Sequence, residues 1–106
     1  MIGQSPDMST PLVSVLLPAY NAASTLRAAL DSLLAQTLRD CEFVIVDDGS
    51  SDETPAILQN YASRDPRIIP IQLTRVGLVE ALNHGLDACR GEFVARMDGD
   101  DLSHKD

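Results

Sequence analysis

Three carboxylates fall close together near the end of the chain, at Asp98, Asp100 and Asp101, with Gly99 between the first two. Ionised carboxylates at this spacing repel one another and lose hydration when partly enclosed, so a cation would relieve both costs. Mg²⁺ and Mn²⁺ prefer oxygen ligands, and Mg²⁺ is usually held by one or two carboxylates together with substrate phosphates. The cluster therefore indicates a metal-assisted phosphate site, while the plainer interpretation is an acidic turn in water in which Gly99 supplies a permissive backbone.

Polar and aromatic side chains also follow three earlier apolar runs. Tyr20 comes after the first run and offers a flat surface on which a base can stack, unless it is a half-buried packing aromatic. Asp48, at the end of the second run, is an acceptor for a base N–H, and the adjacent Asp47 either does the same or orients the turn. Arg75 follows the third run, and its guanidinium suits phosphate oxygens, the alternative being a solvated charge or an ion pair with Glu80.

Asn83 falls in a stretch with helical spacing, where Asn is a poor helix former. It either reaches the sugar end of a ligand or is an ordinary surface residue, and we expect His84 beside it to be exposed. The sequence has no Gly-x-Gly-x-x-Gly after the first apolar run and no Gly-x-x-x-x-Gly-Lys-Ser/Thr loop. The absence of the first motif disfavours a dinucleotide-binding fold of the usual kind. The absence of the second means that the chain lacks the corresponding phosphate-binding loop. No Ser-His-Asp or Cys-His arrangement can be argued.

The elements that must position these residues alternate along the chain. Short apolar runs predict strands over residues 12–17, 42–46, 67–72 and 92–97. Apolar residues at helical spacing between them predict three helices. We expect Ser24 to cap the first helix, Ser50 and Glu53 to form a capping box at the second, and Gly91 to mark the end of the third.

This alternation predicts right-handed βαβ units. The expected fold class is α/β, a Rossmann-like three-layer sandwich with a mostly parallel sheet of about four strands and helices on both faces. Pro18 is expected to stop the first strand, and Pro70 places the third strand at an edge. Ligands of such sheets bind at the carboxyl ends of the strands. The polar residues described above are therefore expected to meet along one rim.

Composition narrows the class of protein further. The chain has 106 residues, enough for one domain, and we expect residues 1–11 to be a flexible leader to a domain over 12–106. The formal net charge of -8 argues against broad nucleic-acid binding and against an anionic membrane surface. No apolar run is long enough to span a membrane, and no signal peptide is visible. Cys41 and Cys89 are interpreted as reduced thiols of a cytoplasmic protein, with a disulfide as the alternative.

Five segments, in order and at matching spacing, resemble the nucleotide-sugar-binding half of family 2 glycosyltransferases, which have the GT-A fold. They are VSVLLPAYN (13–21), SLLAQT (32–37), EFVIVDDGSSD (42–52), the stretch from Gly77 through ALNHG (81–85), and GEFVARMDGDD (91–101). The resemblance covers nearly all of residues 12–102. It implies transfer of a sugar, with inversion, from a nucleoside-diphosphate sugar, most commonly a UDP-sugar, to a saccharide or lipid acceptor.

The resemblance also implies roles for particular residues. Ala19 and Tyr20 would lie against the nucleobase, and Asp48 would bond its N–H. Asp98 and Asp100 would form the Asp-x-Asp motif, with Asp98 near the ribose and Asp100 on a Mn²⁺ or Mg²⁺ ion that bridges the diphosphate. The full set expected to bind the nucleotide sugar is Pro18, Ala19, Tyr20, Asp47, Asp48, Arg75, Asn83, Asp98 and Gly99, with Asp98 and Asp100 as the metal ligands.

Members of this family continue well beyond the motif, into a region that binds the acceptor and carries the catalytic base, whereas this chain stops five residues after Asp101. We therefore expect a truncated donor-binding domain with no catalytic residue of its own and little turnover. A truncated sheet would expose an edge through which two copies could form a homodimer. The full-length protein is expected in the cytoplasm or at the inner face of the membrane.

Two alternatives stay open. Val46-Asp47-Asp48 and Met97-Asp98 resemble the acidic pair and the phosphoacceptor of response-regulator receivers, although the first strand and helix would then be surplus. A nucleotidyltransferase would share the sheet and the metal chemistry. It would ordinarily carry a Gly-rich basic loop after the first strand, where this chain has Ala19-Tyr20-Asn21-Ala22-Ala23.

Overall fold

The computed structural model describes residues 11–36 and 40–97, so the acidic cluster at 98–101 lies outside the described residues. Within them, four parallel strands form one sheet with the order β3-β2-β1-β4. The strands are β1 (Val13–Ala19), β2 (Cys41–Asp48), β3 (Ile68–Leu73) and β4 (Phe93–Arg96). The helices that alternate with them are α2 (Ala23–Gln36), α3 (Thr54–Arg64) and α4 (Leu78–Ala88).

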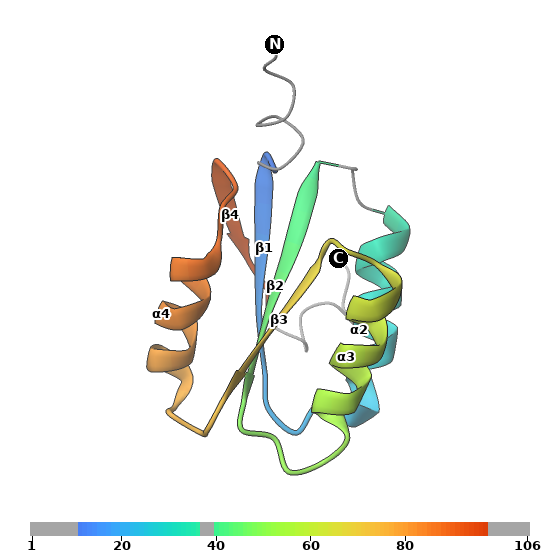
Figure 1. The fold of residues 1–106 in the computed structure, drawn as a ribbon, viewed down its shortest axis with the longest axis vertical. Coiled ribbons are helices and arrows are strands. Elements are labelled where there is room, and N and C mark those ends of the chain that lie inside the picture. Colours follow the sequence, from blue (N-terminus) through green and yellow to red (C-terminus); the bar gives the residue numbers. More distant parts are fainter. Residues whose placement is uncertain (1–10, 37–39, 98–106) are drawn as a thin grey trace.

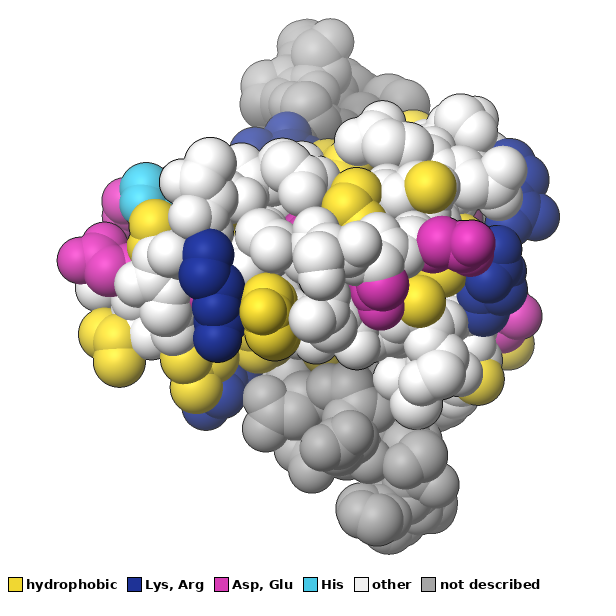
Figure 2. Space-filling model, turned by 90° about the horizontal axis from the view of Figure 1, so that it is seen from below, with side chains coloured by type: hydrophobic (Ala, Val, Ile, Leu, Met, Phe, Trp, Pro, Cys, Tyr) yellow, Lys and Arg dark blue, Asp and Glu magenta, His cyan; other side chains and the backbone are white. Residues whose placement is uncertain are grey.

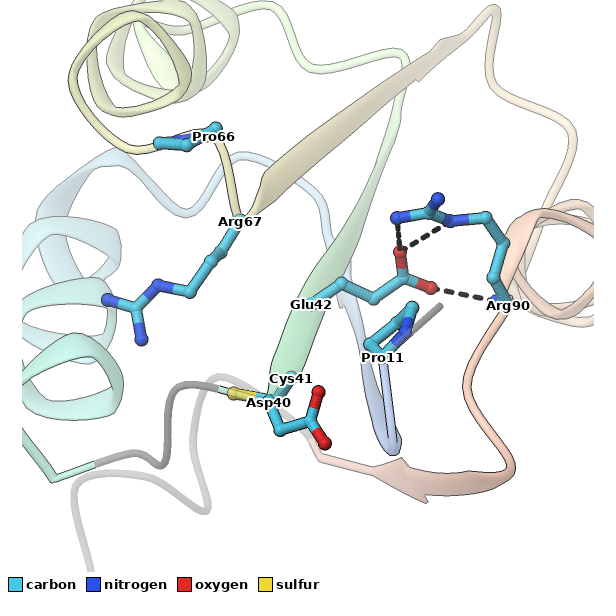
Figure 3. A pocket seen from close by; sticks show the side chains of 7 residues that line it. All are labelled: Pro11, Asp40, Cys41, Glu42, Pro66, Arg67 and Arg90. Carbon is cyan, nitrogen blue, oxygen red and sulfur yellow. Dashed lines mark hydrogen bonds and ion pairs between the residues drawn. The ribbon is translucent and has the colours of Figure 1, made fainter. Parts of the chain in front are cut away.

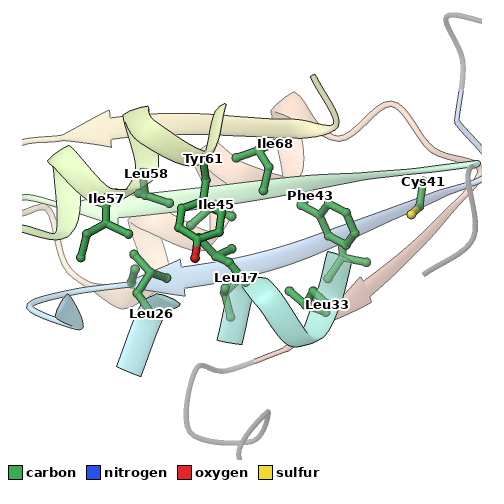
Figure 4. Packing of buried hydrophobic residues seen from close by; sticks show 13 residues of the cluster. Leu17, Leu26, Leu33, Cys41, Phe43, Ile45, Ile57, Leu58, Tyr61 and Ile68 are labelled. Atoms are coloured by element: carbon green, nitrogen blue, oxygen red, sulfur yellow. The ribbon is translucent and has the colours of Figure 1, made fainter. Parts of the chain in front are cut away.

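The helices cover both faces of the sheet, with α2 and α3 on one side and α4 on the other (Figure 1). Successive side chains of a strand point to opposite faces, so Leu17 of β1 packs toward α2 and α3 while Leu16 packs toward α4. Figure 4 shows the larger core, in which Phe43 and Ile45 of β2 lie between the sheet and the helices. The predicted α/β three-layer sandwich with a parallel sheet is confirmed.

The prediction that Pro18 stops the first strand is wrong, because β1 continues one residue past it. The carbonyl of Leu16 accepts a hydrogen bond from the N–H of Met97 at 2.9 Å. Backbone groups two residues apart on a strand point to the same neighbour, so the nitrogen of Pro18 faces the β4 side of β1. Since β4 ends at Arg96, opposite Leu16, the missing N–H leaves no bond of the described ladder unmade.

Other boundaries follow the expected order with small shifts. Pro70 lies in β3, which is an edge strand as predicted. The second strand is longer than the predicted 42–46, since β2 includes both Asp47 and Asp48. It is buried along its whole length. Cys41 and Cys89 form no disulfide. Among the described residues, no helix combines the length and the apolar character that a membrane crossing requires.

Two of the predicted helix caps are wrong. Ser24 lies inside α2, whose first amides are bound by the loop before α3: the N–H of Ala23 donates to Asp52 Oδ2 at 3.1 Å. Ser50 and Glu53 form no capping box, since Glu53, the residue before α3, makes no side-chain cap hydrogen bond. The side chain that binds the start of α2 therefore comes from a distant loop, a contact that local patterns do not reveal. At α3 the N–H of Thr54 donates to Asp52 Oδ1 at 2.9 Å, so Asp52 takes the place predicted for Ser50.

Candidate functional site

The carboxyl ends of β1, β2 and β3 lie at one end of the sheet, the bottom of Figure 1, where the loops 20–22, 49–53 and 74–77 leave the strands. The first two loops are joined by hydrogen bonds: the N–H of Asn21 donates to Ser50 Oγ at 2.8 Å, and the N–H of Ser51 donates to Asn21 Oδ1 at 2.8 Å. Figure 2 views the molecule from this end, where hydrophobic side chains lie on the left, the side of α4, and also across the middle and the right of the face. Three of the four predicted segments thus lie along one rim, and the fourth, at 98–101, lies outside the described residues.

A cavity of about 220 Å³ lies on this rim beside α4. Its lining consists of Pro18, Ala19, Tyr20, Asp48, Arg75, Leu78 and Ala81. The first five were predicted to bind a nucleotide sugar, and the structure brings them together. Sequence reasoning missed Leu78 and Ala81 as site residues, because helical spacing marks them as apolar positions of α4 without showing that this end of the helix meets the rim.

Asp48 anchors the loop between β3 and α4. Its carboxylate is buried, with Oδ1 accepting from the N–H of Val76 at 2.6 Å and Oδ2 accepting from the N–H of Gly77 at 2.9 Å. Arg75 Nη1 also donates to Oδ2, at 3.1 Å. A carboxylate offers about four lone-pair positions, so Asp48 keeps room for one further donor such as a base N–H.

Arg75 lies over the ring of Tyr20, with its guanidinium carbon 3.6 Å from the ring centroid. Arg75 forms its ion pair with Asp48 and not with Glu80, the alternative partner, and the backbone of Arg75 has a positive φ of 65°. A flat, cationic group thus stacks on an aromatic face while donating to a buried carboxylate. A base that stacks on this same face of Tyr20 must therefore displace the guanidinium.

Asp47 is fully buried and points away from the cavity lining. Its Oδ1 accepts from the N–H of Ser50 at 3.2 Å and from the Ser50 hydroxyl, and its Oδ2 accepts from Gln72 Nε2 at 2.7 Å. Both oxygens are thus engaged with the strand and the turn. This arrangement matches the alternative role of Asp47, in which it orients the turn.

The remaining predicted residues are not brought to the cavity by the described part of the chain. Asn83 and His84 lie exposed on α4, and Asn83 is not among the lining residues. Asp98, Gly99 and Asp100 lie outside the described residues. Within residues 11–36 and 40–97, no three His, Cys, Asp or Glu side chains gather as a metal site.

Asp52 bridges the starts of two helices at this rim, and we expect its charge to stabilise the fold in a pH-dependent way. Hydrogen bonds from the hydroxyl and N–H of Thr54, and from the N–H of Ala23, lower the pKa of Asp52 below its ordinary 3.8. A lowered folded-state pKa means that the stabilisation is present above pH 3.8 and is lost as the pH falls through the lowered value.

The substitution Asp52→Asn is therefore expected to reduce the free energy of unfolding at neutral pH, with a difference that shrinks as the medium is acidified. Urea denaturation at a series of pH values measures this. Glu53→Gln is the matched control, since that side chain makes no cap hydrogen bond and its loss should leave stability unchanged. Equal effects of the two substitutions would contradict the role of Asp52.

Comparison with known proteins places the chain among glycosyltransferases. The family model described as glycosyl transferase family 2 matches residues 14–106. The chain is 44% identical over 91 residues to EpsJ, an uncharacterized glycosyltransferase of Bacillus subtilis. The aligned region covers 86% of this chain and 26% of EpsJ. The chain therefore spans about a quarter of the length of this relative.

Solved structures agree with the sequence match. TarS 1-349 of S. aureus superposes with a TM-score of 0.77 at 33% identity, over 85% of this chain and 28% of TarS 1-349, and that TarS region has also been solved with UDP-GlcNAc. The mannosyltransferase PcManGT of Pyrobaculum calidifontis, solved with GDP-Man and Mn²⁺, gives a TM-score of 0.77 at 32% identity, over 86% of this chain and 28% of PcManGT. Since the family model matches most of its length, the chain belongs to glycosyl transferase family 2.

Proposed function

We propose that this chain is the donor-binding part of an inverting glycosyltransferase that uses a nucleoside-diphosphate sugar and a divalent cation. The observation that carries the proposal is the meeting of Tyr20, Asp48 and Arg75 at one cavity on the carboxyl-terminal rim. The solved relatives support the ligand class, since TarS is bound to UDP-GlcNAc and PcManGT to GDP-Man and Mn²⁺. The receiver and nucleotidyltransferase alternatives are not favoured, because the matched relatives are glycosyltransferases.

The cavity residues would divide the nucleotide between them. Tyr20 would stack against the base, and the open acceptor position of Asp48 would take a base N–H. Arg75, once displaced from the Tyr20 ring, would have its fork of donors available for phosphate oxygens. The base would thus replace the guanidinium on the ring, and the freed guanidinium would follow the negative charge of the diphosphate.

Asp98 and Asp100 would hold Mn²⁺ or Mg²⁺, because carboxylate oxygens suit both ions. When bound, the ion would supply electrostatic stabilisation of the negative charge that develops on the departing nucleoside diphosphate. The acidic residues directly follow β4, the neighbour of β1 in the sheet, and β1 leads to Tyr20. The order of strands therefore supports a diphosphate position next to the base cavity.

The acceptor, a saccharide or a lipid, and the catalytic base are not assigned to any residue of this chain. It spans only 26% of EpsJ and 28% of TarS 1-349, so we propose that the 106-residue chain binds donor with little or no turnover. Efficient transfer from a radiolabelled donor by the purified chain would contradict this part of the proposal. Action in the cytoplasm or at the inner face of the membrane is proposed for the whole protein.

The whole proposal is tested by replacing a metal ligand. We expect calorimetry against UDP, GDP and dTDP to show binding that strengthens when Mn²⁺ is added, and Asp100→Asn to abolish the metal-dependent part. Asp101→Asn is the matched control, since this neighbour lies outside the Asp-x-Asp motif and should leave the metal response intact. Unchanged affinity of the Asp100 variant would remove that residue from the site, and no binding of any nucleotide would contradict the function.

A homodimer through the outer edge of β4, on the side away from β1, is also proposed. All four residues of β4 are exposed, and within the described residues β4 pairs with β1 alone. Unpaired backbone groups on such an edge can pair with a second chain. Sedimentation velocity of the purified chain would detect the dimer, and a monomer at all concentrations would contradict it.

A further inference from the structure

A buried carboxylate lies at the opposite end of the sheet from the cavity with Tyr20. Glu42 of β2 is 2% exposed. Its Oε2 accepts from the hydroxyl of Ser14 at 2.6 Å and from the N–H of Arg90 at 2.8 Å. Its Oε1 accepts from Arg90 Nε at 3.1 Å and from Nη2 at 2.9 Å, as Figure 3 shows. Four donors from two other segments thus converge on one side chain.

Ser14 extends this network to the start of β4. Its Oγ donates to Glu42 and accepts from the N–H of Gly91 at 2.7 Å. The backbones approach so closely here that a Cβ on Gly91 would lie 2.6 Å from the nitrogen of Ser14, so only glycine fits. Ser14, Glu42, Arg90 and Gly91, named here the Glu42 cluster, therefore tie β1 and β2 to the segment that enters β4.

Beyond the Glu42 cluster, β4 makes its described contacts chiefly with β1. Its four side chains are all exposed, and its ladder with β1 runs only from Val13 opposite Phe93 to Leu16 opposite Arg96. Met97, just after the strand, packs partly against the larger core. By contrast β2 is buried throughout, between two neighbours. The placement of β4 thus depends on a short ladder and on the Glu42 cluster at its entrance.

We propose that Glu42 is a positioning residue of the donor site: the Glu42 cluster fixes the entrance of β4 and thereby the register of the strand that leads directly to Asp98 and Asp100. The proposal rests on the proposed function, in which those two residues bind the cation. A parallel strand rises about 3.3 Å per residue, so a slip of two residues would move them by roughly 6.6 Å. Metal–oxygen bonds of about 2 Å tolerate no such displacement.

The charge of Glu42 is needed for this role. Burial alone would raise its pKa, but the hydrogen bonds from Ser14 and Arg90 outweigh burial and hold the pKa below the ordinary 4.5. A glutamine could not replace the carboxylate, because Ser14 and Arg90 place donors on both oxygens and the amide NH₂ would face one of them in either orientation. The hydrogen-bond partners of Glu42, Ser14 and Arg90, do not line the cavity with Tyr20, so its effect on the donor would pass through β4.

The test compares Glu42→Gln with the control variant Asp65→Asn. The control breaks the ion pair between Asp65 and Arg67, which lies at the same end of the sheet but does not join β4. Hydrogen exchange should become at least tenfold faster at the amides of Phe93 and Met97 in the Glu42 variant, with β2 amides little changed. Calorimetry with UDP and with GDP should show affinity without metal within about threefold of the wild-type chain. In the Glu42 variant, the factor by which Mn²⁺ increases nucleotide affinity should be at least tenfold smaller than in the wild-type chain, which corresponds to about 1.4 kcal/mol.

Ser14→Ala is the milder second variant if Glu42→Gln folds poorly, since it removes one hydroxyl and leaves the bonds from Arg90 in place. Unchanged exchange in β4, or an unchanged gain from Mn²⁺, would overturn the proposal. So would equal losses with and without metal, or the same pattern in the Asp65 variant, because these indicate general destabilisation. A wild-type chain that binds neither nucleotide would contradict the proposed function instead, and exchange in β4 would still decide whether the Glu42 cluster holds the strand.

Discussion

Replacing Asp48 by asparagine is expected to weaken nucleotide binding at least tenfold and to lower the free energy of unfolding by about 2–3 kcal/mol. The two oxygens of Asp48 accept from different backbone amides, those of Val76 and Gly77. An asparagine can accept only one of these bonds and must turn its NH₂ group toward the other donor. The loop carrying Arg75 would then lose its anchor, and the base would lose its acceptor. Calorimetry with UDP and GDP, together with urea denaturation, measures both effects.

Asp47→Asn is the matched control for this prediction. Asp47 is the adjacent buried carboxylate, but one of its oxygens accepts from the side-chain amide of Gln72. If Gln72 turns its amide over, its carbonyl oxygen can accept from the new NH₂ group, so the contact survives in reversed polarity. We therefore expect a smaller loss of stability and little loss of nucleotide affinity. Similar losses in the two variants would argue that Asp48 acts through general stability rather than in the cavity.

Gly49→Ala is expected to destabilise the chain by about 3 kcal/mol, because two penalties add at one residue. Gly49 has a positive φ of 76°, which costs an L residue roughly 1 kcal/mol or more. A Cβ there would also lie 2.5 Å from the backbone nitrogen of Arg75, a contact with main chain that no side-chain rotation relieves. Thermal denaturation should show a melting temperature lower by roughly 10–20 °C.

Gly49→Asn separates the two penalties. Asparagine tolerates positive φ better than alanine but carries the same Cβ. If contact with Arg75 dominates, the asparagine variant will be nearly as unstable as the alanine variant and will bind nucleotide as poorly. A variant with asparagine that recovers most of the stability would show instead that backbone strain dominates and that the close approach to Arg75 is readily relaxed.

The fold was largely predictable because its signals are local. Alternation of apolar runs and helical spacing predicted the parallel sheet, and Pro70 marked an edge strand because a missing N–H is a property of the residue itself. The effect of Pro18 was not predictable in this way, since it depends on where β4 ends on the far side of β1. Ser50 resembled a helix cap, yet its hydroxyl donates to Asp47, a contact that a pattern for the following helix does not include.

The candidate site was predictable as a set of residue types but not as a set of contacts. Strand ends placed Tyr20, Asp48 and Arg75 on one rim before any geometry was known, and the structure confirms that they meet. The stacking of Arg75 on Tyr20 and its pairing with Asp48 join residues separated by 27 positions or more, where no local rule applies. The nucleotide-binding roles of these three residues stay predictions, as do the roles assigned to Asn83, Asp98, Gly99 and Asp100.

The hydrogen bonds between the rim loops have a thermodynamic consequence for ligand capture. Asn21 joins the loop after β1 to the loop after β2, and Asp48 joins β2 to the loop after β3. Backbone segments already held in place lose little conformational freedom when a ligand arrives, so the entropic penalty of association stays small and falls mainly on the side chain of Arg75. Under the proposed function, such a preorganised surface would favour fast, rigid-body docking of the nucleotide, with one arginine rotamer change as its principal adjustment.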